Sequence, residues 1–460
     1  MSADAPAVTL PASRALSAQD RAGRVRTLAA HHAPLVPALA TVLLMCAPVE
    51  HGDASSPGGI TPADAASAVL VVCCAVRLLR ARGRPLNGTA ALVLGAPAVG
   101  FAVATVTSGD PAASLPGFVR YLQIFVLVPT ALVLTLRTVR DFRVLAGAVV
   151  VLALVQGAIG VEQYLTGTGA SYMGHNIRAV GTFGPLDVMG MSTVVAYGLI
   201  AALAMGLAPD ADAPHWLRPA ALGSAAALLL PLALSFSRGA WIATAVAVGV
   251  VLLLAGLRLA VGTMAALAAV AVVLIGGAGI GSQMMSERFA SITAVSDAPD
   301  RSVTDRYTLW AAATGMWRDN PVTGVGLKGF PAHRDSHASL GLSSGSDTAG
   351  AGLAFQREPL LSPHNMYLLV LSEQGLIGIT ALVGSWAALL VCALRRLPAA
   401  RRRGRAADCG LLATGLLVWQ TVDFLYADIG GPSTVLCAVL FGLVARWALT
   451  EDRAAGADPR

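Results

Sequence analysis

The sequence predicts an all-α integral membrane protein with about twelve transmembrane helices. Charged residues make up 13% of the 460 residues, whereas a soluble domain carries about 25%. Hydrophobic residues make up 55%, and the mean hydropathy is +0.68. The apolar residues also come in long blocks rather than in periodic stripes, so lipid is the expected solvent for most of the surface.

Twelve apolar segments are suited to cross a bilayer, which requires about 20 helical residues. They lie near residues 33–49, 63–79, 89–107, 118–136, 143–162, 187–207, 217–236, 239–256, 259–281, 365–394, 408–427 and 430–449. The predicted organisation is a cytoplasmic N-terminal tail (1–32), helices one to nine (33–281), a long outer loop (282–364), helices ten to twelve (365–449) and a cytoplasmic C-terminal tail (450–460). We expect the first segment to be an uncleaved helix rather than a signal peptide.

The distribution of arginine predicts the orientation of these helices. If the N-terminus is cytoplasmic and the spans alternate, 22 of the 32 basic residues fall on the cytoplasmic side. The short outer loops at 50–62 and 108–117 contain no Lys or Arg. This pattern follows the positive-inside rule and places both termini in the cytoplasm. Seven of the other ten basic residues lie in the long outer loop, which the rule does not constrain.

The long outer loop carries one predicted amphipathic helix, at residues 303–318. Ser302 and Asp305 form a start that resembles a capping box. Arg306 and Trp310 follow at helical spacing, and the sequence Asp319–Pro321 ends the helix. A helix lying on the bilayer with its Trp residues buried would show the same pattern. Both interpretations can hold, since such a helix could present Arg306 to a lipid head group.

Two outer arginines adjoin the central spans. The segment Ser235–Trp241 reads Ser-Phe-Ser-Arg-Gly-Ala-Trp and joins two spans on the outer side. A snorkelling arginine rarely requires such a tight turn, and an outer arginine between long spans opposes the positive-inside rule, so we favour a functional role for Arg238. Arg178 precedes the sixth span in Arg-Ala-Val-Gly-Thr-Phe and, taken alone, is equally typical of a plain loop.

His364 is the candidate for proton transfer. It lies in Ser362–Tyr367, which reads Ser-Pro-His-Asn-Met-Tyr and opens the tenth span. Histidine titrates near neutral pH and can accept a proton from an attacking hydroxyl, although many membrane-surface histidines are only interfacial. Pro363 restricts the backbone and would direct the ring. Glu373 falls on the opposite helix face, so we do not expect it to pair with His364.

Other patterns indicate no cofactor or metal. Gly324, Gly326 and Gly329 spell a dinucleotide-like motif, but prolines flank it where a strand and a helix would be required. The pair Asp210 and Asp212 resembles a metal-nucleotide-sugar motif, yet it falls on a short cytoplasmic loop, and we interpret it as solvated surface. The six cysteines show no disulfide or zinc spacing. Glu373 and Asp423 lie inside spans, where an ionisable residue is functional or faces the bundle.

These motifs occur in a particular order along the chain. Arg-Ala-x-Gly-Thr-Phe comes first, then Ser-Arg-Gly-Ala-Trp, then Arg-x-x-x-Trp and Pro-x-x-Gly-x-Gly in the long loop. Pro-His-Asn-x-Tyr-Leu and Glu-x-Gly-Leu-x-Gly follow at the start of the tenth span. This order resembles the O-antigen ligase/polymerase family of bacterial membrane glycosyltransferases. The resemblance covers about residues 178–378, and the flanking spans resemble the family only in number and hydrophobicity.

The resemblance implies transfer of a glycan from undecaprenyl diphosphate to an acceptor hydroxyl at the outer face of the plasma membrane, without nucleotide sugar, metal or other cofactor. Arginine forks stay charged and bind phosphate oxygens in pairs, which suits a diphosphate leaving group. We therefore expect Arg238 and Arg306 to be catalytic, with His364 as general base and inversion at the anomeric centre. The residues expected to bind substrate are Arg178, Ser237, Trp310, Lys328 and Asn365.

The sequence leaves the type of transfer open. A polymerase would use another lipid-linked glycan as acceptor, whereas a ligase would use a lipid, a protein or a wall polymer. The alternative class is a transporter or flippase of lipid-linked glycans, because twelve helices with both termini inside also describe many secondary transporters. Transporters usually bind substrate near the bilayer midplane, whereas here the distinctive residues cluster at the outer rim. No basic tract interleaved with aromatic residues indicates nucleic-acid binding.

Overall fold

The computed structural model describes residues 33–48, 60–80, 86–172, 175–184, 187–210, 212–272, 301–338, 361–431 and 433–450. The predicted N-terminal tail lies outside the described residues, and so does the C-terminal tail beyond Thr450. Residues 282–300 and 339–360 of the predicted long loop, and the end of the predicted ninth span from residue 273 on, also lie outside them.

Each of the twelve predicted spans contains a helix. These helices are α2 (Val36–Leu43) with the 3-10 turns η1 (Ala33–Leu35) and η2 (Leu44–Cys46), α3 (Pro62–Arg80), α4 (Gly88–Val106), α5 (Pro111–Leu122) joined through the π-helical η3 (Gln123–Leu127) to α6 (Val128–Thr135), α7 (Val139–Thr166), α8 (Gly190–Leu207), α9 (Leu217–Leu234), α10 (Arg238–Ala255), α11 (Leu257–Val272), α15 (Met366–Arg403), α16 (Ala407–Asp423) and α17 (Thr434–Leu449). Within the described residues, eight helical stretches are long and apolar enough to cross a membrane: α3, α4, α5 to α6, α7, α8, α9, α10 and α15. The chain is therefore an all-α membrane protein, and the count of twelve spans stays a prediction because the other four helices are shorter.

Five further elements of the described residues lie between these helices. The strands β1 (Ala170–Tyr172) and β2 (His175–Arg178) form an antiparallel hairpin that the sequence did not predict, and the 3-10 turn η4 (Gly181–Phe183) follows it. The helix α13 (Arg301–Asp319) matches the predicted amphipathic helix but begins before Ser302, so Ser302 is not its cap. The helix α14 (Phe330–His337) was not predicted.

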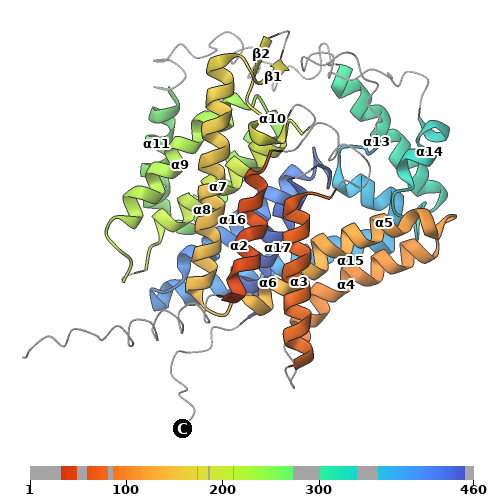
Figure 1. The fold of residues 1–460 in the computed structure, drawn as a ribbon, viewed down its shortest axis with the longest axis horizontal. Helices are drawn as coiled ribbons and strands as arrows, with labels where there is room; N and C mark the ends of the chain where they lie inside the picture. Colours follow the sequence, from red (N-terminus) through yellow and green to blue (C-terminus); the bar gives the residue numbers. More distant parts are fainter. Residues whose placement is uncertain are drawn as a thin grey trace, which may run out of the picture.

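The helices form two groups with α16 and α17 between them. Helices α7, α8 and α9 pack against one another on one side, while α4, α5, α13, α14 and α15 lie on the other (Figure 1). Helix α16 packs against α8 and α10 on the first side and against α15 on the second. All 16 residues of α17 are buried, including Arg446, whose guanidinium donates to the Arg137 carbonyl at 3.0 Å.

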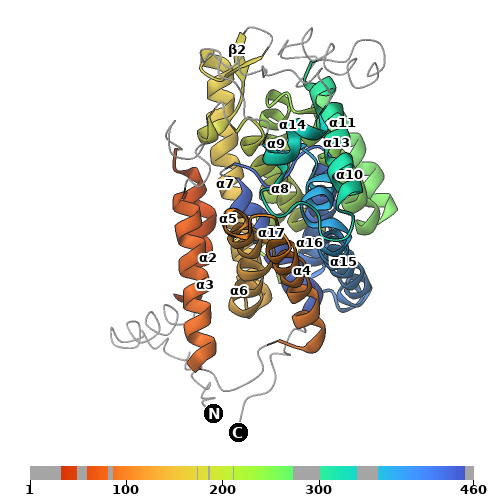
Figure 2. The ribbon, with the colours of Figure 1, turned by 90° about the vertical axis from the view of Figure 1, so that its right-hand side faces the viewer.

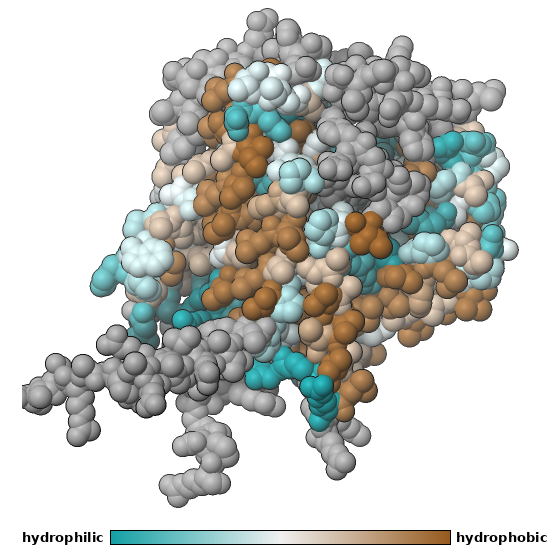
Figure 3. Space-filling model, viewed as in Figure 1, coloured by the Kyte–Doolittle hydropathy of each residue, from teal (hydrophilic) through white to brown (hydrophobic). Residues whose placement is uncertain are grey.

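The molecule has two distinct ends. The hairpin β1–β2, the turn between α9 and α10 and the start of α15 lie at one end, which we call the hairpin end (Figure 2). The loop between α8 and α9 and the turn between α15 and α16 lie at the opposite end. Apolar side chains cover much of the flank between the two ends (Figure 3). Only 33% of the α3 and α9 spans is buried in the protein, against 89% of α8, so α3 and α9 have the surface to contact lipid.

An ion-pair cluster joins three segments at the opposite end. The Arg143 guanidinium on α7 donates to both carboxylate oxygens of Asp408, at 2.7 and 2.8 Å, and lies 2.7 Å from a carboxylate oxygen of Asp210. Asp210 also accepts the Ala406 amide at 2.8 Å. The interpretation of Asp210 as solvated surface is therefore wrong: its carboxylate is neutralised by Arg143 and fixes the loop between α8 and α9.

Helix α15 is interrupted at Gly375, where φ is +60° and ψ is −161°. The interruption frees backbone groups on both sides, and the loop segment 321–329 satisfies them. Four backbone hydrogen bonds join the two segments: Val325 N to Ser372 O (2.9 Å), Gly326 N to Glu373 O (2.9 Å), Leu376 N to Pro321 O (2.9 Å) and Ile377 N to Val322 O (3.2 Å). The buried Glu373 carboxylate adds a bond from the Phe330 amide at 3.2 Å. The segment 321–329 and the interrupted part of α15, residues 372–377, are thus joined by hydrogen bonds although they are far apart in the sequence. We call them together the interlocked unit.

The glycines of this unit allow the close approach of the two segments. Gly324 and Gly326 have φ of +68° and +97°, a region that favours glycine. A Cβ on Gly324 would meet the Glu373 carbonyl carbon at 2.3 Å, and one on Gly326 would meet the Ser108 hydroxyl oxygen at 2.2 Å. These glycines serve backbone packing, in agreement with the rejection of a dinucleotide site.

Substitution of Gly375 by Ala should lower the melting temperature of the purified protein in detergent. A Cβ there would meet the Val322 carbonyl at 2.4 Å, and the positive φ adds strain, so we expect a loss of about 1–3 kcal/mol of stability or more. Gly384→Ala is the matched control, because a Cβ on Gly384 of the same helix meets nothing within 4 Å. Equal melting temperatures for the two variants would contradict the interlocked arrangement.

Candidate active site

The turn between α9 and α10 places Arg238 at a helix N-terminus. Phe236 turns the chain with φ of +51°, and Ser237 caps α10 by accepting the Ala240 amide at 3.4 Å. Ser237 is buried, and its hydroxyl also points to the sulfur of Met189 at 3.2 Å. The side chain of Ser237 is therefore committed to the cap, and it fixes Arg238 as the first residue of α10.

Arg178 lies beside this turn. It ends strand β2, and its Nε donates to the Ser235 carbonyl at 2.9 Å. The next amide, of Ala179, donates to the Leu234 carbonyl at 3.1 Å. The structure thus brings the Arg178 segment and the Arg238 segment together at the hairpin end, although 60 positions separate the two arginines.

Two glutamines of α7 hold the backbone that follows Arg178. Gln163 accepts the amides of Val180 and Gly181, at 3.0 and 2.9 Å, and donates to the Gly181 carbonyl at 2.9 Å. Gln156 accepts the Thr182 amide at 2.9 Å. These side chains explain the conformation of the Arg-Ala-Val-Gly-Thr-Phe motif, and the sequence analysis did not identify them.

His364 has a strained backbone that is held on several sides. Its φ is +50°, which non-glycine residues rarely adopt. The His364 amide donates to the Ser362 hydroxyl at 3.3 Å, and that hydroxyl donates to Asp428. Asn365 caps α15 by accepting the Leu368 amide at 3.1 Å and donates to the Leu425 carbonyl at 3.1 Å. Strained residues of this kind cluster at functional sites, where the surrounding structure holds them in place.

Trp310 connects α13 to the His364 segment. Its indole nitrogen donates to the Pro363 carbonyl at 2.9 Å. Leu309, Ala313 and Met316 form the buried face of α13, and α13 packs against α15. Arg306 precedes Trp310 by about one helical turn, so both side chains leave the same edge of the helix.

The loop after α16, residues 424–433, links the two groups of helices and was missed by the sequence analysis. The Met366 amide donates to the Phe424 and Ala427 carbonyls, at 2.9 and 3.0 Å. On the other group, Gly239 lies against Tyr426, because a Cβ on Gly239 would be 3.5 Å from the Tyr426 Cβ. The Arg238 turn and the His364 segment therefore contact the same loop from two sides.

A comparison with known families decides the identity of this region. Residues 223–383 match the family model described as O-antigen ligase. This region of the chain is similar to O-antigen ligases, and we refer to residues 223–383 as the O-antigen ligase domain. The match confirms the resemblance drawn from the motifs and supports a membrane enzyme that transfers glycans. No curated protein matches the chain.

The O-antigen ligase domain contains most of the predicted site. Its span includes the α9–α10 turn, α13, the interlocked unit at Gly375 and His364. Arg178 and Asp428 lie outside the domain, yet their hydrogen bonds attach them to Ser235 and Ser362 within it. Sequence outside the matched domain thus contributes to the same site.

Lys328 lies apart from the other predicted site residues. It has φ of +62° in the segment 321–329 and is exposed. Its side chain runs along α5, since a Cβ on Gly117 would meet the Lys328 Cγ at 2.9 Å. Among the described residues, no contact places Lys328 beside Arg238 or His364.

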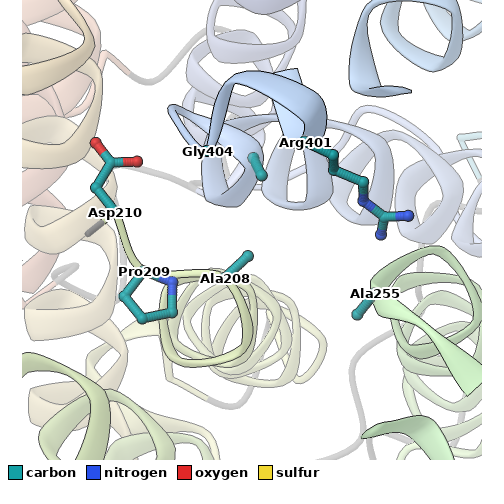
Figure 4. A pocket seen from close by; sticks show the side chains of 7 residues that line it. Ala208, Pro209, Asp210, Ala255, Arg401 and Gly404 are labelled. Carbon is teal, nitrogen blue, oxygen red and sulfur yellow. The ribbon is translucent and has the colours of Figure 1, made fainter. Parts of the chain in front are cut away.

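A hollow of about 240 Å³ lies at the opposite end of the molecule (Figure 4). The α8–α9 loop, the end of α10 and the α15–α16 turn line it, with Arg401 pointing toward it. Its other charged residue, Asp210, is paired with Arg143. None of the predicted site residues lines this hollow.

Asp187 ties the start of α8 to the loop 424–433. It precedes the candidate span of α8; its carboxylate accepts a hydrogen bond from Ser433, and its backbone carbonyl accepts the Gly190 amide at 3.0 Å. One carboxylate oxygen is buried with no partner among the described residues. Burial raises the pKa of Asp187 to about 6, from an ordinary value of 3.8. The native state therefore retains this proton more strongly than the unfolded chain, and stability falls as the pH rises from about 4 through 6.

Asp187→Asn should raise the melting temperature at pH 8 relative to wild type and leave it nearly unchanged at pH 4. The shift in pKa corresponds to a gain of at most about 3 kcal/mol at high pH. Melting curves across this pH range test the expectation, with Asp212→Asn as the control at an exposed carboxylate. A variant that is less stable than wild type at pH 8 would contradict the assignment.

Proposed function

We propose that the protein transfers a glycan from an undecaprenyl diphosphate carrier to an acceptor hydroxyl at the outer face of the bacterial plasma membrane. The reaction would be that of an O-antigen or exopolysaccharide polymerase or ligase, with inversion and without a metal. One observation carries the proposal: the Arg238 turn and the His364 segment contact the same loop, 424–433, and Arg178 is bonded to the Arg238 turn. The arginine segments, which suit a diphosphate, and the histidine segment, which suits a hydroxyl, thus lie around the loop 424–433.

The donor side is formed by Arg178 and Arg238. A leaving diphosphate gains negative charge, and arginine stays charged and binds phosphate oxygens bidentately. Arg238 also begins an 18-residue helix, whose N-terminal amides and dipole favour an anion. Fixed positive groups of this kind stabilise developing charge without reorganisation. Arg306, on the edge of α13 beside Trp310, is positioned to add a third positive charge from the opposite group of helices.

The acceptor side is formed by His364. As general base it would take the proton of the acceptor hydroxyl while that oxygen attacks the anomeric carbon and the carbon–diphosphate bond breaks. A single displacement of this kind inverts the anomeric centre. Ser362 and Asp428 hold the His364 backbone, and Asn365 fixes the start of α15.

The distribution of basic residues supports an orientation in which the hairpin end lies on the outer side of the membrane and the opposite end faces the cytoplasm. Basic residues gather at the opposite end, at Arg143 on α7 and in the last turns of α15, where Arg401, Arg402 and Arg403 lie. The positive-inside rule assigns such an end to the cytoplasm. Donor and acceptor would then meet at the outer face.

His364→Ala should reduce glycan transfer by about 10²–10⁴-fold, the contribution expected of a general base. The assay uses purified protein in detergent, the lipid-diphosphate glycan as donor and EDTA throughout. His333→Ala, at an exposed histidine of α14, is the control and should keep full activity. Wild-type protein that moves the lipid-linked glycan across liposomes but transfers nothing would instead favour a transporter.

Arg238→Ala should reduce transfer by about 10²–10³-fold, as removal of a preorganised charge-stabilising group does. Arg238→Lys should recover only part of the loss, because an ammonium group cannot bind a phosphate bidentately. Arg258→Ala, at an exposed arginine of α11, controls for loss of a positive charge alone. Full transfer by Arg238→Ala in membranes with equal protein would refute the donor-side assignment.

A further inference from the structure

Helix α13 presents one exposed aromatic side chain, Tyr307, beside the half-buried Trp310. Tyr307 and Trp310 meet edge to face, with ring centroids 5.7 Å apart and an interplanar angle of 88°. Tyr307 is 53% exposed, although large aromatic side chains in this protein are mostly buried. The buried face of the helix is formed instead by Leu309, Ala313 and Met316. Tyr307 therefore lies on an exposed edge of α13, against the hydrogen-bonded ring of Trp310.

This aromatic pair lies next to His364. The Trp310 indole donates to the carbonyl of Pro363, the residue before His364. This bond fixes the Trp310 ring and, through it, the ring of Tyr307. On the other side of the same segment, Ser362 donates to Asp428. The candidate base is thus flanked by aromatic rings from α13 and by a carboxylate from the loop 424–433.

Aromatic rings together with a carboxylate form a surface suited to a sugar. A pyranose ring has an apolar C–H face that packs on an aromatic side chain, and its hydroxyls donate to carboxylate oxygens. A negative carboxylate on this side also disfavours an anionic acceptor, in contrast to the arginines on the donor side. A peptide hydroxyl has no comparable apolar face.

We propose that Tyr307, Trp310 and Asp428 form the subsite for the acceptor, and that the acceptor is the sugar end of a glycan rather than a protein. This assignment rests on the proposed function and adds to it the class of acceptor. Tyr307 is the residue that specifies the subsite, because it is exposed beside Trp310 and takes no part in the buried face of α13.

The test compares Tyr307→Ala with Tyr307→Phe. The acceptor probe is the glycan freed from its lipid by mild acid, and a serine-containing peptide is offered in parallel. Loss of the ring should raise KM for the freed glycan about tenfold with kcat and the donor KM nearly unchanged, the pattern of lost ground-state binding. Tyr307→Phe keeps the ring and should stay within about twofold of wild type. The peptide should accept no glycan.

Other outcomes would overturn the subsite. An unchanged acceptor KM in Tyr307→Ala would show that Tyr307 is only an interfacial anchor of the kind found at membrane surfaces. Transfer to the peptide in preference to the glycan would refute the class of acceptor.

A calorimetric measurement of freed-glycan binding to wild type and to Tyr307→Ala separates the proposed subsite from the proposed function. Tyr307-dependent binding without any transfer would support the subsite and count against the proposed reaction, whereas transfer without Tyr307-dependent binding would do the reverse.

Discussion

Backbone polar groups within a membrane must find partners inside the protein, and the interrupted helix α15 shows how this requirement shapes the site. A break at Gly375 would leave carbonyl and amide groups unsatisfied in an apolar environment, at a cost of several kcal/mol each. The segment 321–329 supplies the missing partners through four backbone hydrogen bonds. Helix α13 ends at Asp319, directly before this segment. The hydrogen bonds that hold the segment against α15 therefore also fix where α13 lies. The position of Trp310 beside Pro363 follows from that anchoring.

Backbone strain marks the same region. Among the described residues, four non-glycine residues have positive φ, and three of them, Phe236, Lys328 and His364, lie within the O-antigen ligase domain. Each lies in the last three residues before a helix begins, at α10, α14 and α15 respectively. Such conformations cost about 1–3 kcal/mol each and persist only where neighbours enforce them. At Phe236 the strain makes the turn that presents Arg238, and at His364 it sets the direction in which the side chain leaves the backbone.

The sequence predicted the parts of this protein that depend on local pattern. Hydropathy located a helix in each of the twelve predicted spans, and helical spacing located α13. Motif order predicted Arg238 and His364 as separate site candidates, and their catalytic roles stay a prediction. Contacts between distant segments carry no such signal: Ser362 and Asp428 are 66 positions apart, and Gln156 lies in an apolar helix like many others. Ser237 shows the converse, since its place in a motif suggested substrate binding whereas its hydroxyl caps α10.

The attachment of the loop 424–433 bears on how the two sides of the proposed site stay aligned. The loop connects α16 to the fully buried α17, and it contacts the start of α15 on one side and Gly239 on the other. The proposed reaction would require the hydroxyl and the diphosphate to be held to within about 0.5 Å of the productive geometry. Neither α10 nor α15 alone could set the distance between Arg238 and His364, because they belong to different groups of helices. A loop mounted on the central pair α16–α17 can do so, since any shift of one side relative to the other must break hydrogen bonds in a packed interior.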